Sequence, residues 1–449
     1  MGAASTSSSL DVAARRARAA AAWGLTDECV VVFSGRAIPI PGGADQCFPF
    51  RAHPDHRWLA GRGVEGGVVA FDPREGWSEF LPGIGEAERL WEGREDEPLG
   101  EAQPMSRLEP WLVARAGRPL ARLGATEPSM PPFDAPLARR LGELLLHARR
   151  PKDEHEIALM RRAAAATAAG FARARELVRP GISERAIAIE IEAAMFRAGG
   201  ERTAYETIVA SGPRSAILHG LPTERIVGPG DIVLVDAGVE VGGYCADVTR
   251  VVAAPGPLMP ERRALCDLVA SAQRRAIERC RPGVAWRDVH TATAHDLAAG
   301  LAEIGLVRGG AAEIVASETI ALFLPHGVGH MFGLGVRDAG GRLPAPRGHD
   351  GRPLPDEEPR TCCGVALRVD LPLEIGYAMT VEPGLYLVPA LLGAAQRRER
   401  FARQVDWALV DRWLDLGVGG VRIEDDVIVR ADGPEILTRE IPVAWSAVA

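Results

Sequence analysis

The sequence predicts an α+β protein of two domains, in which a smaller α/β domain precedes a larger α+β domain. Three observations support this. The chain has 449 residues, enough for about two to three domains. Its composition shifts at residues 150–154, and helical and strand-like patterns are mixed on both sides of that shift. We therefore expect a disordered tail at residues 1–10, an N-terminal domain at residues 11–147 and a second domain at residues 150–449.

The first domain is predicted to be a small sheet with flanking helices. Residues 11–24 are rich in alanine and arginine and have helical composition. Apolar runs broken by glycine predict strands at residues 28–33, 57–61, 67–71, 112–113 and 121–123. Residues 49–58 are predicted to be a solvated loop that leaves His53 and His56 on the surface. Residues 81–110 are rich in acidic residues, glycine and proline, which indicates connecting structure with short helices.

The second domain is predicted to combine long helices with short strands. Alanine-rich and amphipathic patterns predict helices at residues 157–177, 184–198, 260–280 and 286–304. Ser183 is placed to cap the second of these helices. Residues 207–210 and 231–235 read as strands, and the latter is an apolar, β-branched run typical of a buried strand.

Composition excludes several classes of function. Apolar residues make up 47% of the chain, but no apolar run is long enough to span a bilayer. The net charge of −8 arises from 60 acidic and 52 basic residues without a long block of one sign. This argues against a nucleic-acid or anionic-membrane binder. The seven cysteines are scattered without metal-type spacing or a disulfide framework, so we expect a reducing cytoplasm.

Two aspartates, Asp236 and Asp247, follow the apolar run at residues 231–235. A hairpin turning near residues 241–243 would set them nearly opposite each other. At the end of a buried strand two such carboxylates cannot both stay ionised unless a metal ion or a basic group neutralises them. For an isolated pair the alternative is two solvated aspartates at a hairpin mouth. Motifs elsewhere in the chain are needed to distinguish between these alternatives.

Three later motifs add potential metal ligands. Residues 325–333 hold two histidines four positions apart, His326 and His330, and their glycines favour a loop or strand over a helix. Glu382 ends an apolar strand before a Pro-Gly turn, and Glu424 shares a strand face with Arg422. Four carboxylates and one imidazole are together a ligand set that two divalent cations could share.

These motifs match a known family in order. The segments DAG and ADVTR (Asp236, Asp247), HGVGH (His330), VEPG (Glu382) and RIED (Glu424) resemble the pita-bread metallopeptidases, which include methionine aminopeptidase, aminopeptidase P and prolidase. The resemblance implies a pita-bread catalytic domain at residues 150–449. The segment PFRAHPDHRWLAG is similar to the N-terminal domain of aminopeptidase P and prolidase, and this implies proline specificity.

The resemblance also implies roles for individual residues. Asp236, Asp247, His330, Glu382 and Glu424 would bind two metal ions, a bridging water or hydroxide would be the nucleophile, and Glu382 would accept its proton. His219 and His326 would donate hydrogen bonds to substrate oxygens, and Arg422 would orient the carboxylates. Mostly oxygen ligands with one imidazole favour Mn²⁺, with Co²⁺, Zn²⁺ and Fe²⁺ as alternatives.

Some features separate the subgroups or depart from the family. Arg368 matches a prolidase arginine that holds the free carboxylate of an Xaa-Pro dipeptide, although a surface arginine is the alternative. Arg337 stands where the family usually has a histidine, so it would stabilise an oxyanion or grip an anionic substrate group. The insertion at residues 340–363 is either a solvated loop or a lid. Asp55 matches a position that can reach a neighbouring active site.

We therefore expect a cytoplasmic, dinuclear Xaa-Pro peptidase, either an aminopeptidase P or a prolidase. Its partners would be short proline-containing peptides, with no nucleic acid and no membrane, and it would form a homodimer or a larger homo-oligomer. One alternative is a hydrolase of the same fold that acts on a non-proline amide or an organophosphorus ester. The other is an inactive binding scaffold, which retention of all five ligand positions argues against.

Overall fold

The computed structural model describes residues 9–44, 46–95, 100–125, 133–341 and 361–443. The chain divides into two compact units, Met1–Arg150 and Pro151–Ala449, and each has its own hydrophobic core. Helix α1 (Ser9–Trp23) begins inside the range expected to be a disordered tail, so Ser9 and Leu10 are helical. Residues 1–8 lie outside the described residues.

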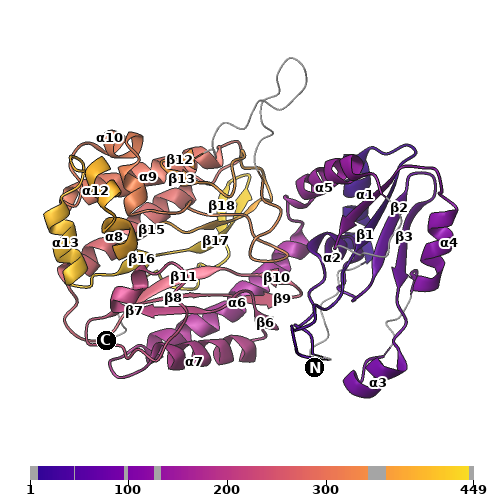
Figure 1. The fold of residues 1–449 in the computed structure, drawn as a ribbon, viewed down its shortest axis with the longest axis horizontal. Coiled ribbons are helices and arrows are strands. Elements are labelled where there is room, and N and C mark those ends of the chain that lie inside the picture. The colour runs from indigo at the N-terminus through magenta and orange to yellow at the C-terminus, as the bar shows by residue number, and fades with distance from the viewer. Residues whose placement is uncertain (1–8, 45, 96–99, 126–132, 342–360, 444–449) are drawn as a thin grey trace, which may run out of the picture. The chain divides into compact units, whose positions relative to one another are not determined.

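A five-stranded sheet forms the centre of the first unit (Figure 1). Its strand order is β4-β3-β2-β1-β5, with β1 Cys29–Phe33, β2 Val68–Asp72, β3 Gly76–Leu81, β4 Gln103–Pro104 and β5 Leu120–Gly124. The remaining helices of this unit are α2 Pro54–Ala60, α3 Glu86–Glu92, α4 Leu108–Val113 and α5 Ala135–Arg149. Strand β1 pairs antiparallel with β2 and parallel with β5. Alternate residues of β1 pack with the buried side of α4, so this helix covers one face of the sheet.

Two strand predictions for this unit are wrong. Residues 112–113 end helix α4, and residues 57–61 lie in or directly after helix α2. Proline at the first helical position of α2 and a cap from the His53 side chain to the backbone N–H of Asp55 favour the helix. The helix turns His56 inward against Gly67, so this histidine is fully buried (0% exposed) rather than on the surface. His53 is half-buried.

The second unit contains the long helices. The predictions at residues 157–177, 184–198, 260–280 and 286–304 are confirmed as α6 Glu154–Leu177, α7 Glu184–Arg197, α8 Pro260–Glu278 and α9 Trp286–Glu303. Ser183 caps α7 by accepting a hydrogen bond from the backbone N–H of Ala186, as predicted. Shorter helices are α10 Ala311–Ala316, α11 Pro389–Leu392, α12 Ala395–Arg400 and α13 Trp407–Asp415.

The strands of the second unit form several small sheets. Strands β7 Ile208–Ser211, β8 Ile232–Ala237 and β11 Val248–Ala253 form one sheet in the order β11-β8-β7. A second sheet contains β6 Arg202–Thr203, β9 Val239–Val241 and β10 Tyr244–Cys245, and a third contains β14 Ala378–Val381, β17 Asp425–Arg430 and β18 Gly433–Ile436. Two further sheets have two strands each: β12 Thr361–Cys362 pairs with β13 Val365–Ala366, and β15 Gly384–Tyr386 pairs with β16 Gly420–Arg422. An isolated bridge between Thr249 and Glu424 joins β11 to the segment between β16 and β17.

The alternation of side chains along β8 decides where its aspartate points. Val233 and Val235 face a core shared with α6 and α7, whereas Ile232 and Leu234 face the large core shared with α8 and α9. Asp236 continues the second row, because side chains two apart on a strand share a face. Its carboxylate therefore points toward the interior of the unit, on the side of β16.

The hairpin after β8 differs in register from the prediction. Asp236 pairs with Thr249, and Val241 pairs with Tyr244, so the turn residues are Gly242 and Gly243. Both glycines have positive φ, 60° and 84°, as a two-residue hairpin turn requires. Asp247 thus lies two residues before the partner of Asp236 instead of directly opposite it. A shift of two residues keeps both aspartates on the same face, so they still converge.

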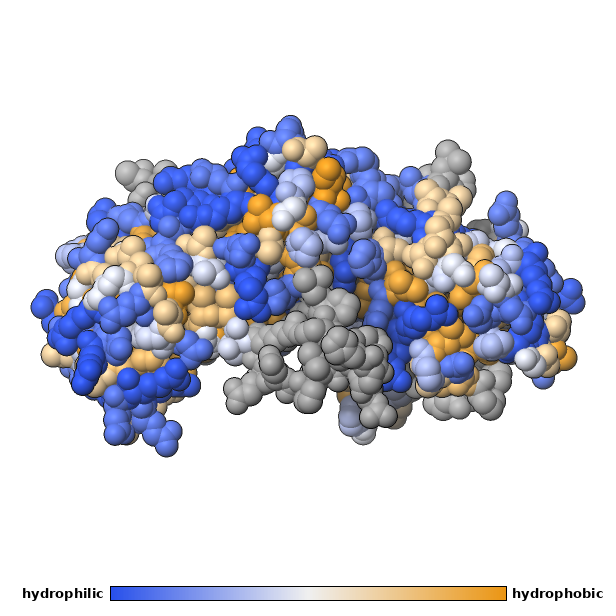
Figure 2. Space-filling view, turned by 90° about the horizontal axis from the view of Figure 1, so that it is seen from above, coloured by the Kyte–Doolittle hydropathy of each residue, from blue (hydrophilic) through white to orange (hydrophobic). Residues whose placement is uncertain are grey.

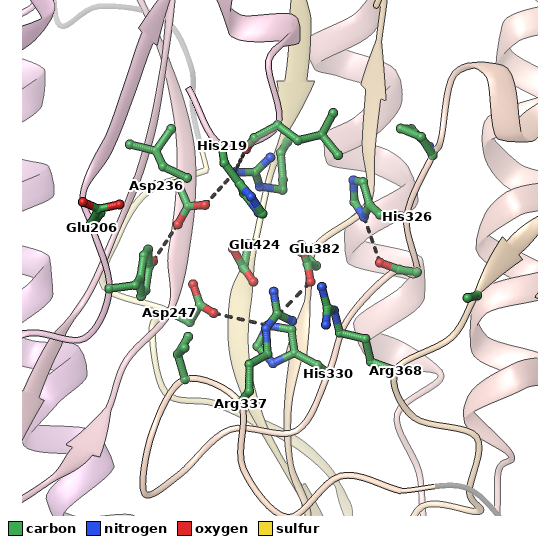
Figure 3. Close-up of a pocket in the computed structure, with 18 of the residues that line it drawn as sticks. Glu206, His219, Asp236, Asp247, His326, His330, Arg337, Arg368, Glu382 and Glu424 are labelled. Carbon is green, nitrogen blue, oxygen red and sulfur yellow. Dashed lines mark hydrogen bonds and ion pairs between the residues drawn. The ribbon is translucent and has the colours of Figure 1, made fainter. Parts of the chain in front are cut away.

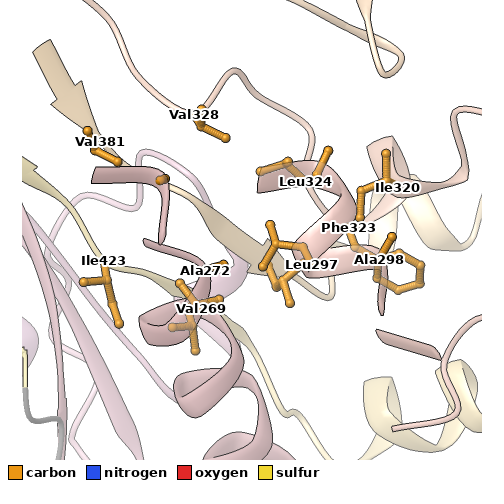
Figure 4. Close-up of a cluster of buried hydrophobic side chains, with 14 of the residues drawn as sticks. Val269, Ala272, Leu297, Ala298, Ile320, Phe323, Leu324, Val328, Val381 and Ile423 are labelled. Atoms are coloured by element: carbon orange, nitrogen blue, oxygen red, sulfur yellow. The ribbon is translucent and has the colours of Figure 1, made fainter. Parts of the chain in front are cut away.

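The large core of the second unit packs the helix pair α8–α9 against the strands that carry the later motifs (Figure 4). Leu297 and Ala298 of α9 pack with Phe323 and Leu324, and the same cluster continues to Val381, directly before Glu382. Burial of this apolar surface holds the acidic strand ends in place, since each fully buried aliphatic side chain stabilises the fold by about 1.5–3 kcal/mol.

The face shown in Figure 2 is mostly hydrophilic, with apolar residues in small separate groups. Exposed large apolar side chains include Leu90 and Trp91 on α3 and Ile375 in the second unit. Within the described residues, every helix is too short or too polar to cross a bilayer.

Candidate active site

A cavity of about 930 Å³ lies within the second unit (Figure 3). Its lining brings together residues from β8, β16 and the segments around β11, β13 and β14, which are far apart in the sequence. The predicted site residues that line it are His219, Asp236, Asp247, His326, His330, Arg337, Arg368, Glu382, Arg422 and Glu424. Asp55, the remaining predicted residue, belongs to the first unit.

The acidic side chains converge on one imidazole. His330 Nε2 lies 3.3 Å from Asp247 Oδ2 and 3.7 Å from Glu382 Oε1. Potential ligand atoms of Asp247, His330 and Glu424 all lie within 4.8 Å of one another. Figure 3 shows Asp236 on the neighbouring side of the same group. The structure therefore gathers the five side chains that the sequence singled out as metal ligands.

His330 is held in the orientation that a metal ligand needs. Its Nδ1 lies 3.0 Å from the Met331 carbonyl oxygen, so Nδ1 carries the proton and donates it there. Nε2 faces the carboxylates, and in the neutral form of the ring it is the unprotonated nitrogen that can bind a cation. Its backbone N–H donates to Thr380 Oγ1 at 3.1 Å, which ties the loop to β14.

A close approach of two backbones places this loop. A Cβ atom at Gly329 would lie 2.0 Å from the Thr380 carbonyl oxygen and 2.8 Å from the Trp286 ring, so only glycine fits. Thr380 precedes Glu382 on the same segment. The glycine therefore allows the loop with His330 to lie against the strand that carries Glu382.

A basic residue orients the other side of the site. Arg422 Nη2 donates to Asp236 Oδ2 at 2.5 Å, and Arg422 Nε donates to Thr249 Oγ1 at 3.0 Å. The Thr249 hydroxyl then donates to Glu424 Oε2 at 2.7 Å. Tyr205 Oη donates to Asp236 Oδ1 at 2.6 Å. Two of the carboxylates are thus fixed by one connected hydrogen-bond network.

Burial makes this group of carboxylates unfavourable without positive charge. It raises the pKa of Asp236 and Glu382, and it raises that of Glu424 well above the ordinary value, with the charges of the neighbouring acids adding to the effect. For Asp247 burial acts in the same direction, but in the absence of a cation the hydrogen bond and charge of a protonated His330 outweigh burial and lower the pKa. Carboxylates that resist ionisation as a group and face one imidazole suit divalent cations, which would neutralise them. The residues that line the site therefore fit bound divalent cations.

Both ring nitrogens of His326 contact protein groups. Its Nδ1 lies 2.8 Å from the Gly327 carbonyl oxygen, and its Nε2 lies 2.9 Å from Tyr386 Oη. Burial lowers its pKa to about 3, so the ring is neutral, Nδ1 donates to Gly327 and Nε2 accepts from Tyr386. Tyr386 Oη in turn accepts from Arg422 Nη1 at 3.0 Å. Both ring nitrogens are occupied within the protein, which leaves neither one to donate to a substrate in this arrangement.

Another part of the cavity wall carries two long basic side chains that are exposed. Arg337 and Arg368 both line the cavity, and Figure 3 shows them side by side near His330. The charge of Arg337 is the main reason why the pKa of Arg368 is lowered. Within the described residues, neither guanidinium forms an ion pair with an acidic side chain. His219, also exposed, lies on the wall next to Asp236.

Asp55 forms its ion pair within the first unit. It lies in the first turn of α2, is 8% exposed, and accepts a hydrogen bond from Arg149 Nη1 at 2.5 Å. Most of the insertion at residues 340–363 lies outside the described residues, so its predicted lid is outside them too. Only its two ends are described, and Thr361–Cys362 forms β12.

Sequence reasoning missed the two tyrosines of the network. Tyr205 and Tyr386 hold Asp236 and His326, and the chain has only four tyrosines in total. Tyr386 follows Glu382 by four residues, so its proximity to a candidate ligand was a usable signal. Tyr205 had no such signal, because β7 brings it to the site only through pairing with β8.

Comparison with known proteins is consistent with this geometry. The model of metallopeptidase family M24 matches residues 158–431. The chain is 35% identical over 294 residues to "Probable Xaa-Pro aminopeptidase pepP" of Emericella nidulans, which covers 64% of this chain and 60% of the fungal protein. It is 30% identical over 418 residues to the protein of the same name from Neosartorya fischeri, with 88% and 86% of the two chains covered.

Solved structures show the same fold. Aminopeptidase PepP of Pseudomonas aeruginosa is similar with a TM-score of 0.75 and 28% identity over 96% of both chains. Zn-substituted aminopeptidase P of E. coli in complex with product has a TM-score of 0.76 at 24% identity, over 98% of this chain and 97% of the other, which shows the fold alone. These likenesses confirm the predicted α+β pita-bread fold. The matched family implies divalent metal ions.

Proposed function

The chain belongs to metallopeptidase family M24, and we propose that it hydrolyses the peptide bond between an N-terminal residue and a following proline in short peptides. The observation that carries this proposal is the convergence of four carboxylates and the correctly oriented His330 in one cavity. The names of the relatives from Emericella nidulans and Neosartorya fischeri support the choice of an Xaa-Pro bond.

Two divalent cations would be held by Asp236, Asp247, His330, Glu382 and Glu424. When bound, such ions polarise a peptide carbonyl and lower the pKa of a water shared between them, so that an amide can be attacked at neutral pH. We propose Mn²⁺ as the ion, because four of the five ligands are hard oxygen donors and only one is an imidazole; Co²⁺, Zn²⁺ and Fe²⁺ are the alternatives.

Glu382 is the proposed proton acceptor. It lines the cavity, and its side chain is 15% exposed, whereas Glu424 is buried. Burial and the charge of Asp247 raise its pKa, which favours uptake of a proton by this carboxylate. Arg422 would hold Asp236 and, through Thr249, Glu424 while the proton moves.

The histidines would act on the substrate in different ways. We assign hydrogen-bond donation to a substrate oxygen to His219, which is exposed on the cavity wall. His326 is assigned an indirect role, because its Nε2 already accepts from Tyr386. It would position the tyrosine hydroxyl unless substrate binding turns the ring.

Arg337 and Arg368 define the proposed substrate class. Two adjacent guanidiniums repel each other, and an anionic group between them would relieve that repulsion. In a short peptide the anionic group nearest to the reacting bond is the C-terminal carboxylate. We therefore propose that dipeptides and tripeptides, with their carboxylate close to the Xaa-Pro bond, are preferred over longer chains.

The test is hydrolysis of a free Xaa-Pro dipeptide and of an Xaa-Pro-Xaa tripeptide by metal-stripped protein reloaded with Mn²⁺. Cleavage of the dipeptide alone would identify a prolidase, and strong cleavage of the tripeptide would identify an aminopeptidase P. If neither is cleaved by protein with two ions bound, the Xaa-Pro proposal is wrong, and Arg337 then favours a different substrate such as a non-proline amide or an organophosphorus ester.

The proposal also covers the oligomeric state and the cellular location of the protein. We propose a homodimer or a larger homo-oligomer, and a cytoplasmic location in keeping with the seven free cysteines of the structure. For Asp55 to reach a neighbouring active site, its carboxylate would have to leave Arg149. Light scattering at working concentration tests the dimer, and a monomer would also exclude the proposed reach of Asp55.

A further inference from the structure

A second group of metal-binding side chains lies outside the catalytic cavity. His290 on α9 meets Cys362 and Cys363 of the β12–β13 hairpin. None of the three lines the catalytic cavity. The same hairpin leads directly into residues 366–368, which form part of the cavity wall and include Arg368. Figure 1 shows β12 and β13 beside α9.

The distances within this group match a shared ion. One potential ligand atom from each residue lies within 4.8 Å of the other two, and the two sulfur atoms are 3.8 Å apart. Two thiolates bound to one tetrahedral Zn²⁺ at about 2.3 Å lie about 3.8 Å from each other. A disulfide would instead need the sulfurs at about 2.05 Å. The observed separation is that of two ligands of one ion.

The environment of the His290 ring independently indicates a bound ligand. The residue is 0% exposed, and neither of its ring nitrogens has a hydrogen-bond partner of good geometry among the described residues, although the backbone of Cys362 is close enough to raise the pKa of the ring slightly against the effect of burial. An unsatisfied polar group in the interior costs about 1–3 kcal/mol, so such groups usually have a partner. Burial lowers the pKa of His290 to about 4, which keeps the ring neutral and able to bind a cation.

Cys362 differs from the buried thiols of the core of the same unit. A hydrogen bond with Cys363 is the main reason why the pKa of Cys362 is lowered to about 6, and Thr291 Oγ1 lies 3.2 Å from its sulfur. The same hydrogen bond raises the pKa of Cys363, so an ion would have to displace the proton that the two thiols share. By contrast, burial alone raises the pKa of Cys280 to about 12. A thiolate, the form that binds metals, therefore forms more readily at Cys362 than at this core cysteine.

We propose that His290, Cys362 and Cys363 bind one thiophilic divalent cation of the Zn²⁺ or Cd²⁺ class, with water or a small external thiol as the fourth ligand. Two thiolates balance the charge of such an ion and one neutral imidazole completes the set. The ion joins α9 to the β12–β13 hairpin and so secures the wall that carries Arg368. It is separate from the catalytic ions, whose ligands contain no sulfur.

The test uses Cd²⁺ as the probe, because sulfur-to-metal charge transfer in the ultraviolet reports only thiolate ligands. Metal-stripped, reduced full-length protein is titrated with Cd²⁺ after the catalytic site has been filled with Mn²⁺. We expect a charge-transfer band that saturates at one equivalent. The double variant Cys362→Ser/Cys363→Ser should lose the band, and His290→Ala should weaken Cd²⁺ binding at least about tenfold.

The control is Cys47→Ser, which removes an exposed thiol of the first unit and should leave the titration unchanged. Thermal unfolding of each metal-free variant shows whether it still folds, and the single variants Cys362→Ser and Cys363→Ser replace the double variant if it does not. Absence of the band in reduced wild-type protein overturns the proposal. So does a Cd²⁺ affinity that His290→Ala leaves unchanged, or a Cys362–Cys363 disulfide that forms readily and resists reduction.

Discussion

Arg422 Nη2 lies 2.5 Å from Asp236 Oδ2, and both side chains are buried. The same guanidinium reaches Thr249 and Tyr386, so one residue connects a proposed metal ligand to the hydroxyl that bonds Glu424 and to the hydroxyl that bonds His326. Arg422 presents several donors in a fixed planar arrangement, which a lysine could not reproduce. It is therefore the residue that fixes the relative positions of both halves of the site.

Replacement of Arg422 by lysine should weaken Mn²⁺ binding by about 10–100-fold, because the orientation of Asp236 and Glu424 would be lost while one positive charge stays. Isothermal titration of metal-stripped protein measures this. Arg185→Lys is the matched control, since Arg185 forms an exposed ion pair with Glu224 away from the cavity. Equal affinity in Arg422→Lys and wild type would contradict the assigned role.

Replacement of Glu382 by glutamine should lower kcat by about 10²–10⁴-fold, because the amide keeps one oxygen ligand but cannot accept a proton. The measurement is steady-state hydrolysis of an Xaa-Pro peptide at saturating Mn²⁺, together with the metal content of the variant. Glu190→Gln, which alters a helix-surface acid bonded to Arg173, serves as the control. A variant that binds both ions and keeps full turnover would exclude Glu382 as the proton acceptor.

Arg337→His restores the residue usual in the family. If Arg337 binds the substrate carboxylate, the variant should lose at least about tenfold in kcat/KM for a free Xaa-Pro dipeptide, equal to about 1.4 kcal/mol. The amidated dipeptide lacks the anionic group, so its kcat/KM should change little. An equal loss on both substrates would point to oxyanion stabilisation instead, and no change on either would show that Arg337 plays no part.

The stability of the metal-free protein should depend on pH through the carboxylate group. The pKa values of Asp236, Glu382 and Glu424 are raised in the folded state from ordinary values of 3.8 for Asp and 4.5 for Glu. These three carboxylates therefore hold more protons in the folded state than in the unfolded state, so their contribution is fully present below the ordinary values and is lost as pH rises through the raised ones.

Urea unfolding at about pH 5 and about pH 8 measures this effect. We expect the stability gained on adding Mn²⁺ to be larger at the higher pH, where fewer protons compete with the ions for the carboxylates. Glu424→Gln should reduce the pH dependence of the metal-free protein, because the amide does not titrate. An Mn²⁺ stabilisation that is the same at both pH values would contradict the proposed cation site.

Gly329→Ala should destabilise the protein by about 1–3 kcal/mol and weaken metal binding together, since a Cβ at this position would lie 2.0 Å from the Thr380 carbonyl oxygen. Gly310→Ala is the control, because no atom lies within 4 Å of a Cβ built there. Chemical unfolding and Mn²⁺ titration of both variants give the comparison. A stable Gly329→Ala protein with normal metal affinity would show that the loop can move away from β14.

The local elements of the second unit follow from the sequence, and so do the ligand types. Helices α6 to α9 have long apolar periodicity, and α7 has a cap at Ser183. Both signals come from residues that are close together in the sequence. The acids at Asp236, Glu382 and Glu424 each end or interrupt an apolar strand. A charge that is costly to bury in such a place indicates a function even before any contact is known.

Tertiary structure decided what depends on pairing between distant segments. The Gly242–Gly243 turn set the hairpin register that pairs Asp236 with Thr249, and a local pattern alone could not distinguish a two-residue shift that keeps the same face. Helix α2 is a different case, because its proline and cap are local signals that outweighed the short apolar run resembling a strand. The cluster of His290, Cys362 and Cys363 depends on tertiary structure, because its ligands meet only where the β12–β13 hairpin packs on α9.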